Sequence, residues 1–460
     1  MLLTFLQLSK TMMRWPVRSS AVWLRACIIG TFFILATFFL FPQDNTRLRA
    51  SPAPNVPSGT NPCTASPPTD KIVVSVKSGA TEALDRIPVQ MRTALRCVQH
   101  VLLFSDLEQD LGQYHLHDAL DTVSATVVDS NPDFKFYTRQ YELWQSDQDV
   151  GSLKGAKSPG SPNDLAAWVL DKYKNLHILE KTWALKPDMD WYVFIDADTY
   201  VIWSNLVLWL GTLSPSKKSY FGSEVSISGV RFAHGGSGII LSRAAMYELA
   251  VIHNGTAAHW DAMIRERCCG DLVLGLALKE LGTELQDVWP TMSGEAPATM
   301  PFGPGTPEYW CRPALTMHHL SPSDMSDLSS FEMQRLASGI QSPLSHAEIF
   351  KEFLLDEIQS SRDDWDNLAA DPGEFGKTGG ILSEMASFED CARTCEANLN
   401  CFQYSHNGNR CHVGMSVRLG YKKQANEDGM WRSGWNKTRL GEWILKQPLC
   451  EQIKFPGQGS

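Results

Sequence analysis

The sequence lacks the features of a small, fibrous or repetitive protein. Its 460 residues contain no internal repeat and no regular glycine period, and hydrophobic residues make up 43% of the chain. A chain of this length and composition can bury a large core, and we expect two or three folded units of unequal size. Low-complexity, collagen-like and small disulfide-scaffold proteins are therefore excluded.

Positive charge is also scarce. Lys and Arg total 41 against 51 Asp and Glu, which gives a formal charge of −10, and four of the basic residues precede Phe41 in a stretch without any acid. Nucleic-acid binding depends on Lys and Arg to replace phosphate counterions, so we expect no nucleic-acid partner. A phosphate ester would need a metal or a local pocket to hold it.

One long run has no charged residue at all, residues 26–41. It is apolar on every face and, extended back to Ala21, is long enough to cross a membrane. Basic residues precede it, which predicts a cytoplasmic tail at 1–25, a transmembrane signal anchor at 26–41 and a single-pass type II arrangement. The Pro-, Ser- and Thr-rich residues 42–70 are predicted to form a stem. A cleaved signal peptide and a buried core helix are the alternatives.

Ten of the 11 cysteines follow this segment. An even number fits an oxidising compartment. We expect the adjacent Cys268 and Cys269 to take part in a disulfide, with Cys311 as the partner. The acceptor sequons at Asn254 and Asn436 are compatible with secretory passage.

The folded region begins with an alternation typical of an α/β sheet with parallel strands. A β-branched run at 72–76, helical spacing over 81–96 and a second strand at 101–105 follow one another. Residues 164–183 are expected to form a helix capped by Asp164. The apolar run at 191–195 is typical of a strand covered on both faces.

The last of these strands ends in two acids, Asp196 and Asp198. Open α/β sheets bind ligands beyond the carboxyl ends of their strands, and carboxylate oxygens suit Mg²⁺ or Mn²⁺. The pair therefore predicts a metal or nucleotide site, although similar pairs are often solvated turn residues.

Three further segments carry possible chemistry. His318 and His319 offer an imidazole that, with carboxylates, fits Mn²⁺, or they are ordinary core or surface histidines. Asp271 lies at a predicted helix start, where it is either a general base or an N-cap. The glycines at 235, 236 and 238 serve a close substrate approach or a tight turn.

Together these motifs resemble glycosyltransferase family 31, which includes Fringe and core 1 β1,3-galactosyltransferase, in its fungal form. The resemblance covers residues 71–331. In order, the motifs are VSVKS at 74–78, FSD at 104–106, WYVFIDADTY at 191–200, HGGSG at 234–238, CGDLVLG at 269–275 and MHH at 317–319.

The resemblance implies a GT-A fold, for which we assign residues 71–345, and an inverting, Mn²⁺-dependent transfer from a UDP-sugar to a glycan or glycoprotein hydroxyl, with a β1,3 linkage. It also implies a Golgi location.

The resemblance implies a role for eight residues: Lys77, Ser78, Asp106 and Lys174 at the nucleotide, Asp196 at the metal and ribose, Asp198 and His318 at the metal, and Asp271 as the base. His319 is the alternative metal ligand. Many relatives have a third acid where this sequence has Ala197.

The C-terminal part has a different character, with four cysteines within 21 residues (391, 395, 401 and 411). Residues 376–450, after an expected linker at 346–375, resemble a PAN/Apple module. The resemblance implies that Cys391 pairs with Cys411 and Cys395 with Cys401, and that the module binds carbohydrate or protein. Alternatively, it only packs on the catalytic domain.

Two other functions remain open from sequence. One is a non-catalytic membrane protein that binds carbohydrate or protein through the PAN-like module. The other is a metal-dependent hydrolase, which is disfavoured because the sequence suggests no second cluster of carboxylates and histidines.

Overall fold

The computed structural model describes residues 62–306, 309–371 and 381–457. The predicted tail, the anchor at 26–41 and residues 42–61 of the stem lie outside these residues. Within the described ranges, no helix is both long and apolar enough to span a membrane.

The centre of the fold is an eight-stranded sheet in the order β11-β7-β10-β5-β1-β2-β4-β3. β1 is parallel to both of its neighbours, β2 and β5, and β10 is antiparallel to β5 and β7. The fold is therefore mixed α/β with a largely parallel centre, in agreement with the predicted alternation. The strands are β1 Ile72–Lys77, β2 His100–Ser105, β3 Gln109–Leu111, β4 Tyr114–Asp118, β5 Trp191–Asp196, β7 Tyr220–Gly222, β10 Ile239–Ser242 and β11 Leu285–Asp287.

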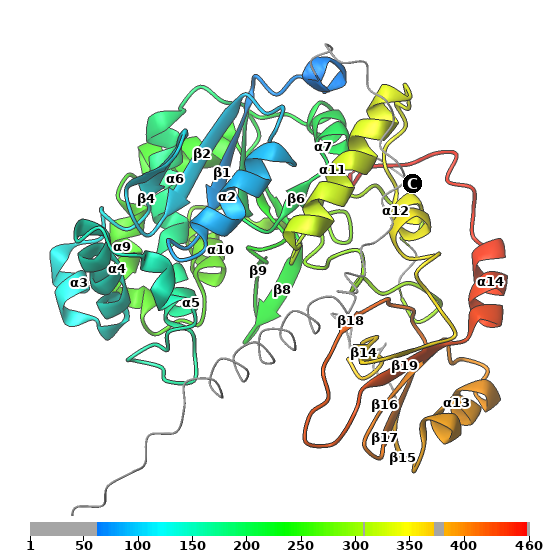
Figure 1. Ribbon diagram of the computed structural model, residues 1–460. Helices are drawn as coiled ribbons and strands as arrows, with labels where there is room; N and C mark the ends of the chain where they lie inside the picture. Colours follow the sequence, from blue (N-terminus) through cyan, green and yellow to red (C-terminus); the bar gives the residue numbers. More distant parts are fainter. Residues whose placement is uncertain (1–61, 307–308, 372–380, 458–460) are drawn as a thin grey trace, which may run out of the picture. The chain divides into compact units, whose positions relative to one another are not determined.

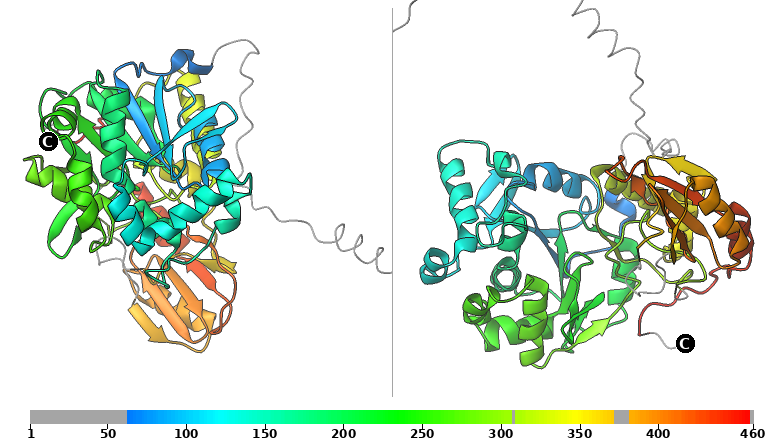
Figure 2. Two further views of the ribbon diagram at one scale, coloured as in Figure 1. Left: turned by 90° about the vertical axis from the view of Figure 1, so that its left-hand side faces the viewer. Right: turned by 90° about the horizontal axis from the view of Figure 1, so that it is seen from below.

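Helices cover both faces of this sheet (Figures 1 and 2). Val74 and Val76 of β1 belong to a core that includes residues of α2, α7, α11 and α12, whereas Val73 belongs to a second core with residues of α6, α9 and α10. Burial on both sides explains why β1 and β5 are apolar runs. The helices are α2 Ala83–Arg92, α3 Ala125–Ser130, α4 Lys135–Gln145, α5 Ala166–Asp171, α6 Lys174–Leu185, α7 Trp203–Leu210, α8 Arg243–Tyr247, α9 Thr256–Ile264, α10 Gly270–Glu280, α11 Pro322–Ala337 and α12 His346–Phe353.

Two short pairs complete this part: β6 Tyr200–Val201 with β12 Thr316–Met317, and β8 Glu224–Ile227 with β9 Val230–Ala233. The first pair holds the segment after β5 beside the segment that leads to His318. It therefore joins two motifs that are far apart in the sequence.

The helix predicted over 164–183 is divided into α5 and α6. Tyr173 lies at the break and is fully buried, and its hydroxyl donates to Asp133 Oδ2 at 2.8 Å. The predicted cap is wrong, because the N-cap residue is Leu165 and no side chain caps the helix. The tertiary contacts of Tyr173 outweigh the continuous helical pattern of the sequence.

The C-terminal region forms an antiparallel sheet in the order β13-β19-β16-β17-β15, with α13 Phe388–Ala397 and α14 Lys437–Leu445. Disulfide Cys391–Cys411 fastens α13 to β17, and Cys395–Cys401 joins α13 to the segment before β16; both implied pairings are confirmed. The relation to PAN/Apple modules stays a prediction. The strands are β13 Ser361–Asp363, β15 Ile381–Glu384, β16 Gln403–Asn407, β17 Arg410–Gly414 and β19 Arg432–Trp435, and β14 Trp365–Asp366 pairs separately with β18 Tyr421–Lys422.

The expected pairing of Cys268 or Cys269 with Cys311 is wrong. Cys311 pairs with Cys450, Cys268 pairs with Cys269, and Cys63 pairs with Cys97. Trp443 of α14 packs edge-on against Trp310, with ring centroids 5.2 Å apart, and this packing places the following segment beside Cys311.

The segment expected as a linker, 346–375, contains α12, β13 and β14. Ile349 and Phe350 of α12 are fully buried in the same core as Val417 and Trp435 of the C-terminal region. Phe302 and Val417 also exchange backbone hydrogen bonds. The two folded parts therefore share one continuous core.

Candidate active site

The ends of three neighbouring strands bring the predicted nucleotide residues together. Lys77 at the end of β1 lies opposite Asp196 at the end of β5 in the parallel register. Asp106 follows β2 directly. The strand order alone thus places three of the predicted side chains at one edge of the sheet.

These side chains form a charged network with residues from the break between α5 and α6. Lys77 pairs with Asp171 and, at 3.2 Å, with Asp196. Lys174 pairs with Asp106 and, at 3.1 Å, with Asp171, and donates to the Ser78 carbonyl at 2.9 Å. Asp171 therefore links the two lysines.

The network fixes the charge of its members. Burial would lower the pKa of Lys77, but the Asp171 and Asp196 carboxylates outweigh burial and raise it. The pKa of Lys174 is raised in the same way, against burial, by Asp106 and Asp171. Burial would raise the pKa of Asp171, but the two ammonium groups lower it to about 2. Both lysines are thus held as cations, and Lys77 is part-exposed at the strand edge.

A second group contains the predicted metal ligands. One ligand atom from each of Asp198, His318 and His319 lies within 4.8 Å of the others, and His318 Nδ1 is 3.3 Å from Asp198 Oδ1. Burial lowers the pKa of His318 to about 3, so its imidazole is neutral and one ring nitrogen carries a lone pair. A carboxylate with imidazoles is a donor set that fits Mn²⁺.

The structure separates the two acids of the strand end. Asp196 lies with Lys77 and outside the group of Asp198, His318 and His319. His319 has a left-handed backbone with φ 59°, a strained conformation that is common at functional sites. Both histidines, and not only the first, therefore lie beside Asp198.

The glycine motif lies between the metal group and Asp271. A Cβ at Gly236 would lie 2.2 Å from His318 Nε2, so only glycine lets that ring approach the backbone. Gly235 N donates to Asp271 Oδ2 at 2.9 Å, and Leu272 N donates to Oδ1 at 2.8 Å. The glycines thus allow close packing of protein side chains, while Gly238, with φ 90°, serves the turn.

Asp271 lies in the first turn of α10, whose N-cap residue is Cys269. A small cavity is lined by Lys77, Asp196 and Gly235 and so connects the charged network to the glycine motif. The predicted base, the metal group and the nucleotide residues therefore surround one edge of the sheet.

Two residues of the site, Asp171 and Arg86, were not predicted from sequence. Asp171 carries a signal, since it precedes Lys174 by three residues, a spacing that favours ion pairs on helices. Arg86, whose Nη2 lies 3.9 Å from Asp198 Oδ2, approaches only through the packing of α2 and carries no such signal.

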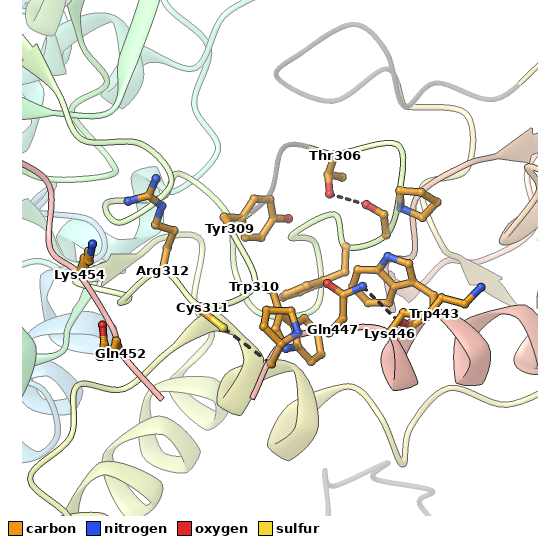
Figure 3. Close-up of a pocket in the computed structure, with 14 residues that line it drawn as sticks. Thr306, Tyr309, Trp310, Cys311, Arg312, Trp443, Lys446, Gln447, Gln452 and Lys454 are labelled. Carbon is orange, nitrogen blue, oxygen red and sulfur yellow. Dashed lines mark hydrogen bonds between the residues drawn. The ribbon is translucent and has the colours of Figure 1, made fainter. Parts of the chain in front are cut away.

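A large cavity lies elsewhere in the described part of the chain. It measures about 840 Å³ and is lined by Tyr309, Trp310 and Arg312 on one side and by Trp443 and Lys446 on the other (Figure 3). None of the predicted site residues lines it.

The segment that contains the central sheet and its carboxyl edge is similar to a known family. Residues 68–291 match the Fringe-like family. The matched segment contains all eight strands of the central sheet and every predicted site residue before His318. The match supports a glycosyltransferase.

No curated protein is significantly similar to the chain in sequence. Among solved structures, a glycosyltransferase involved in glycosylation of the major capsid of PBCV-1 is similar at 11% identity and TM-score 0.24, over 57% of this chain and 99% of its own. Galactosyltransferase LgtC, in complex with donor and acceptor sugar analogues, is similar at 9% identity and TM-score 0.25, over 61% of this chain and 99% of its own.

Proposed function

We propose that the chain is an inverting, Mn²⁺-dependent glycosyltransferase of the GT-A type that moves a hexose from a UDP-sugar to a hydroxyl of a glycan or glycoprotein, with a β1,3 linkage. One observation carries the proposal: the Lys77–Asp171–Lys174 network, the Asp198 and His318 group and Asp271 meet at one strand edge, around the glycine motif.

The nucleotide is assigned to the charged network. Lys77 supplies a part-exposed cation for an anionic ligand, and Asp196 beside it accepts hydrogen bonds from ribose hydroxyls. Lys174 and Asp106 are buried, so they hold the backbone at Ser78 in place and leave contact with the nucleotide to their neighbours.

The metal is assigned to Asp198 and His318, with His319 as a further ligand. When bound, Mn²⁺ would offset the negative charge that develops on the departing diphosphate. Thr199 supports the site, because its hydroxyl lies 3.1 Å from His318 Nδ1 and donates to the Gly236 carbonyl at 2.7 Å.

Asp271 is the proposed general base. Backbone donors from Gly235 and Leu272 stabilise its carboxylate and fix its orientation. It accepts the proton of the acceptor hydroxyl, whose oxygen forms a bond to the anomeric carbon. The bond from that carbon to the diphosphate oxygen breaks on the opposite side, and UDP leaves with the electron pair.

We also propose a single-pass type II Golgi protein, whose anchor at 26–41 keeps the catalytic part in the lumen. The proposal is supported by the apolar run and by the disulfides, which require an oxidising compartment.

The experiment is a transfer assay. Full-length protein is incubated with Mn²⁺, a panel of UDP-sugars and candidate acceptors, and UDP release and product are recorded for wild type, Asp271→Asn and the exposed control Asp356→Asn. We expect one donor to be used, with the rate lowered about 10²–10⁴-fold in Asp271→Asn and unchanged in the control. Wild-type turnover in Asp271→Asn would overturn the assignment of the base. Absence of both turnover and donor binding would favour a non-catalytic carbohydrate- or protein-binding role.

A further inference from the structure

A second group of metal-ligating side chains lies on the β3–β4 hairpin, at the edge of the central sheet. Glu108 directly precedes β3, and His115 and His117 are on β4. Ligand atoms of the three lie within 4.8 Å of one another. The sequence suggested no second cluster of this kind, and that expectation is wrong.

The hairpin explains how the three residues meet. Asp110 of β3 lies opposite His115 of β4, and Gln109 lies opposite Leu116. Side chains two residues apart share one face of a strand, so His115 and His117 project together while Leu116 is buried in the core on the other face. One polar face of the hairpin therefore carries all three metal-ligating side chains.

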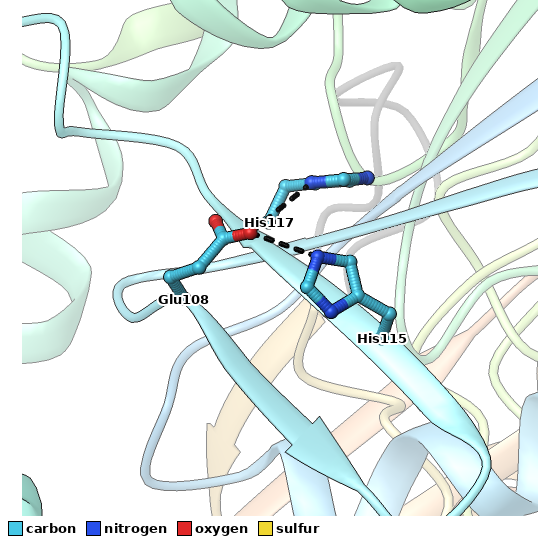
Figure 4. A group of neighbouring side chains, drawn as sticks. All are labelled: Glu108, His115 and His117. Carbon is cyan, nitrogen blue, oxygen red and sulfur yellow. Dashed lines mark hydrogen bonds and ion pairs between the residues drawn. The ribbon is translucent and has the colours of Figure 1, made fainter.

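The three side chains are close enough for a single ion to bind them all. Glu108 Oε1 lies 2.8 Å from His115 Nε2 and 3.5 Å from His117 Nδ1 (Figure 4). Ligand atoms around a tetrahedral Zn²⁺, with bonds of about 2.0–2.1 Å, lie about 3.4 Å apart. An ion between the three atoms would replace the present hydrogen bond between Glu108 Oε1 and His115 Nε2.

Outer contacts already orient two of these ligands. Asp110 Oδ1 lies 2.8 Å from His115 Nδ1, so that in a metal-bound form the ring proton would stay on Nδ1 and Nε2, which now lies 2.8 Å from Glu108 Oε1, would face the ion. The backbone N–H of Asp118 donates to Glu108 Oε2 at 2.7 Å, which leaves Oε1 for the ion. A carboxylate that holds the far nitrogen of a ligating histidine is a usual feature of zinc sites.

We propose that Glu108, His115 and His117 bind a Zn²⁺-class transition-metal ion, with Asp110 as the positioning residue. Two imidazoles and one carboxylate select such an ion over Mg²⁺ or Ca²⁺, and about half of the His115 and Glu108 side chains is exposed, so the ion has access from solvent. The bound ion joins the residue before β3 to β4 and so fastens the segment that follows Asp106. The site does not depend on the proposed transferase function.

The test is metal titration of full-length protein that has been freed of metal with a chelator. Co²⁺ is added while its ligand-field absorption is recorded, and Zn²⁺ is then used to displace it. The variants are His115→Ala/His117→Ala, the two single variants, Asp110→Asn and the control His253→Ala. In the control an exposed histidine lies 3.5 Å from Glu248, outside the described metal-ligating groups.

We expect the double variant to bind one equivalent less than wild type, with loss of one absorption component. Asp110→Asn keeps the stoichiometry but weakens affinity about 10–100-fold, and His253→Ala changes neither. If the double variant does not fold, the single variants decide, since each loses the tight site. Unchanged stoichiometry and affinity in the variants would overturn the proposal and leave a hydrogen-bonded hairpin without a metal role.

Discussion

The molecule has two groups of carboxylates and histidines that differ in how they are assembled. Asp198, His318 and His319 come from the turn after β5 and the segment after β12, and His318 is buried against Gly236. Glu108, His115 and His117 come from one hairpin; Glu108 and His115 are exposed, and His117 is half-buried. The residues of the first group come together only when the whole domain folds, whereas those of the second come together when the β3–β4 hairpin forms.

This difference has a physical consequence. The first group adjoins a network of two lysines and three aspartates, in which each charge depends on its neighbours. Removing one member leaves another charge buried without a partner. The hairpin group lies in solvent, where water replaces any lost partner. Substitutions should therefore be costly at the first group and mild at the second.

The largest effect is expected for Lys174→Met. This change leaves Asp106, which is fully buried, without its cation, and it should lower the free energy of unfolding by about 3–5 kcal/mol. Urea unfolding followed by fluorescence measures the change, with Lys422→Met on the exposed β18 as control. Equal stability of the two variants would mean that the network does not support the site.

The second prediction concerns catalysis and contrasts the two groups directly. Asp198→Ala should lower the transfer rate on the order of a hundredfold or more, since it removes charge placed to stabilise the leaving group. His115→Ala/His117→Ala should leave the rate with Mn²⁺ unchanged. The transfer assay measures both, and a comparable loss in the hairpin variant would show that the two groups act together.

The smallest effect is a pH dependence of stability. The pKa of Asp171 is lowered to about 2 by Lys77 and Lys174, against the opposing effect of burial, so its stabilisation is present above the ordinary aspartate pKa and is lost as the pH falls through about 2. The stability difference between wild type and Asp171→Asn should shrink by up to about 2 kcal/mol between pH 4 and pH 2. A difference that stays constant over this range would argue against the ion pairs.

Much of the central sheet could be predicted from sequence, because buried parallel strands such as β1 and β5 are continuous apolar runs. The strand end then placed Asp196 and Asp198 at the carboxyl edge, and the family resemblance added Lys77. The position of Asp271 at a helix start was also correct. These features depend on local pattern and on the general rule for ligand sites in α/β sheets.

Other features depend on tertiary packing that no local pattern reports. The strands of the β3–β4 hairpin are short and polar, so the spacing of Glu108 and His115 has no meaning until the turn is known. The Cys311–Cys450 disulfide follows from the packing of α14. In both cases the sequence contains the residues, but it does not show which of them come into contact.

The central claim is that the carboxyl edge of β1, β2 and β5 binds a nucleotide-sugar through a metal held by Asp198 and His318. Calorimetric titration of UDP into full-length protein, with and without Mn²⁺, tests it most directly. The account predicts that UDP binds wild type only when Mn²⁺ is present and that Asp198→Ala abolishes this binding. Equal UDP binding by wild type and Asp198→Ala, or no binding by wild type with Mn²⁺, would contradict it.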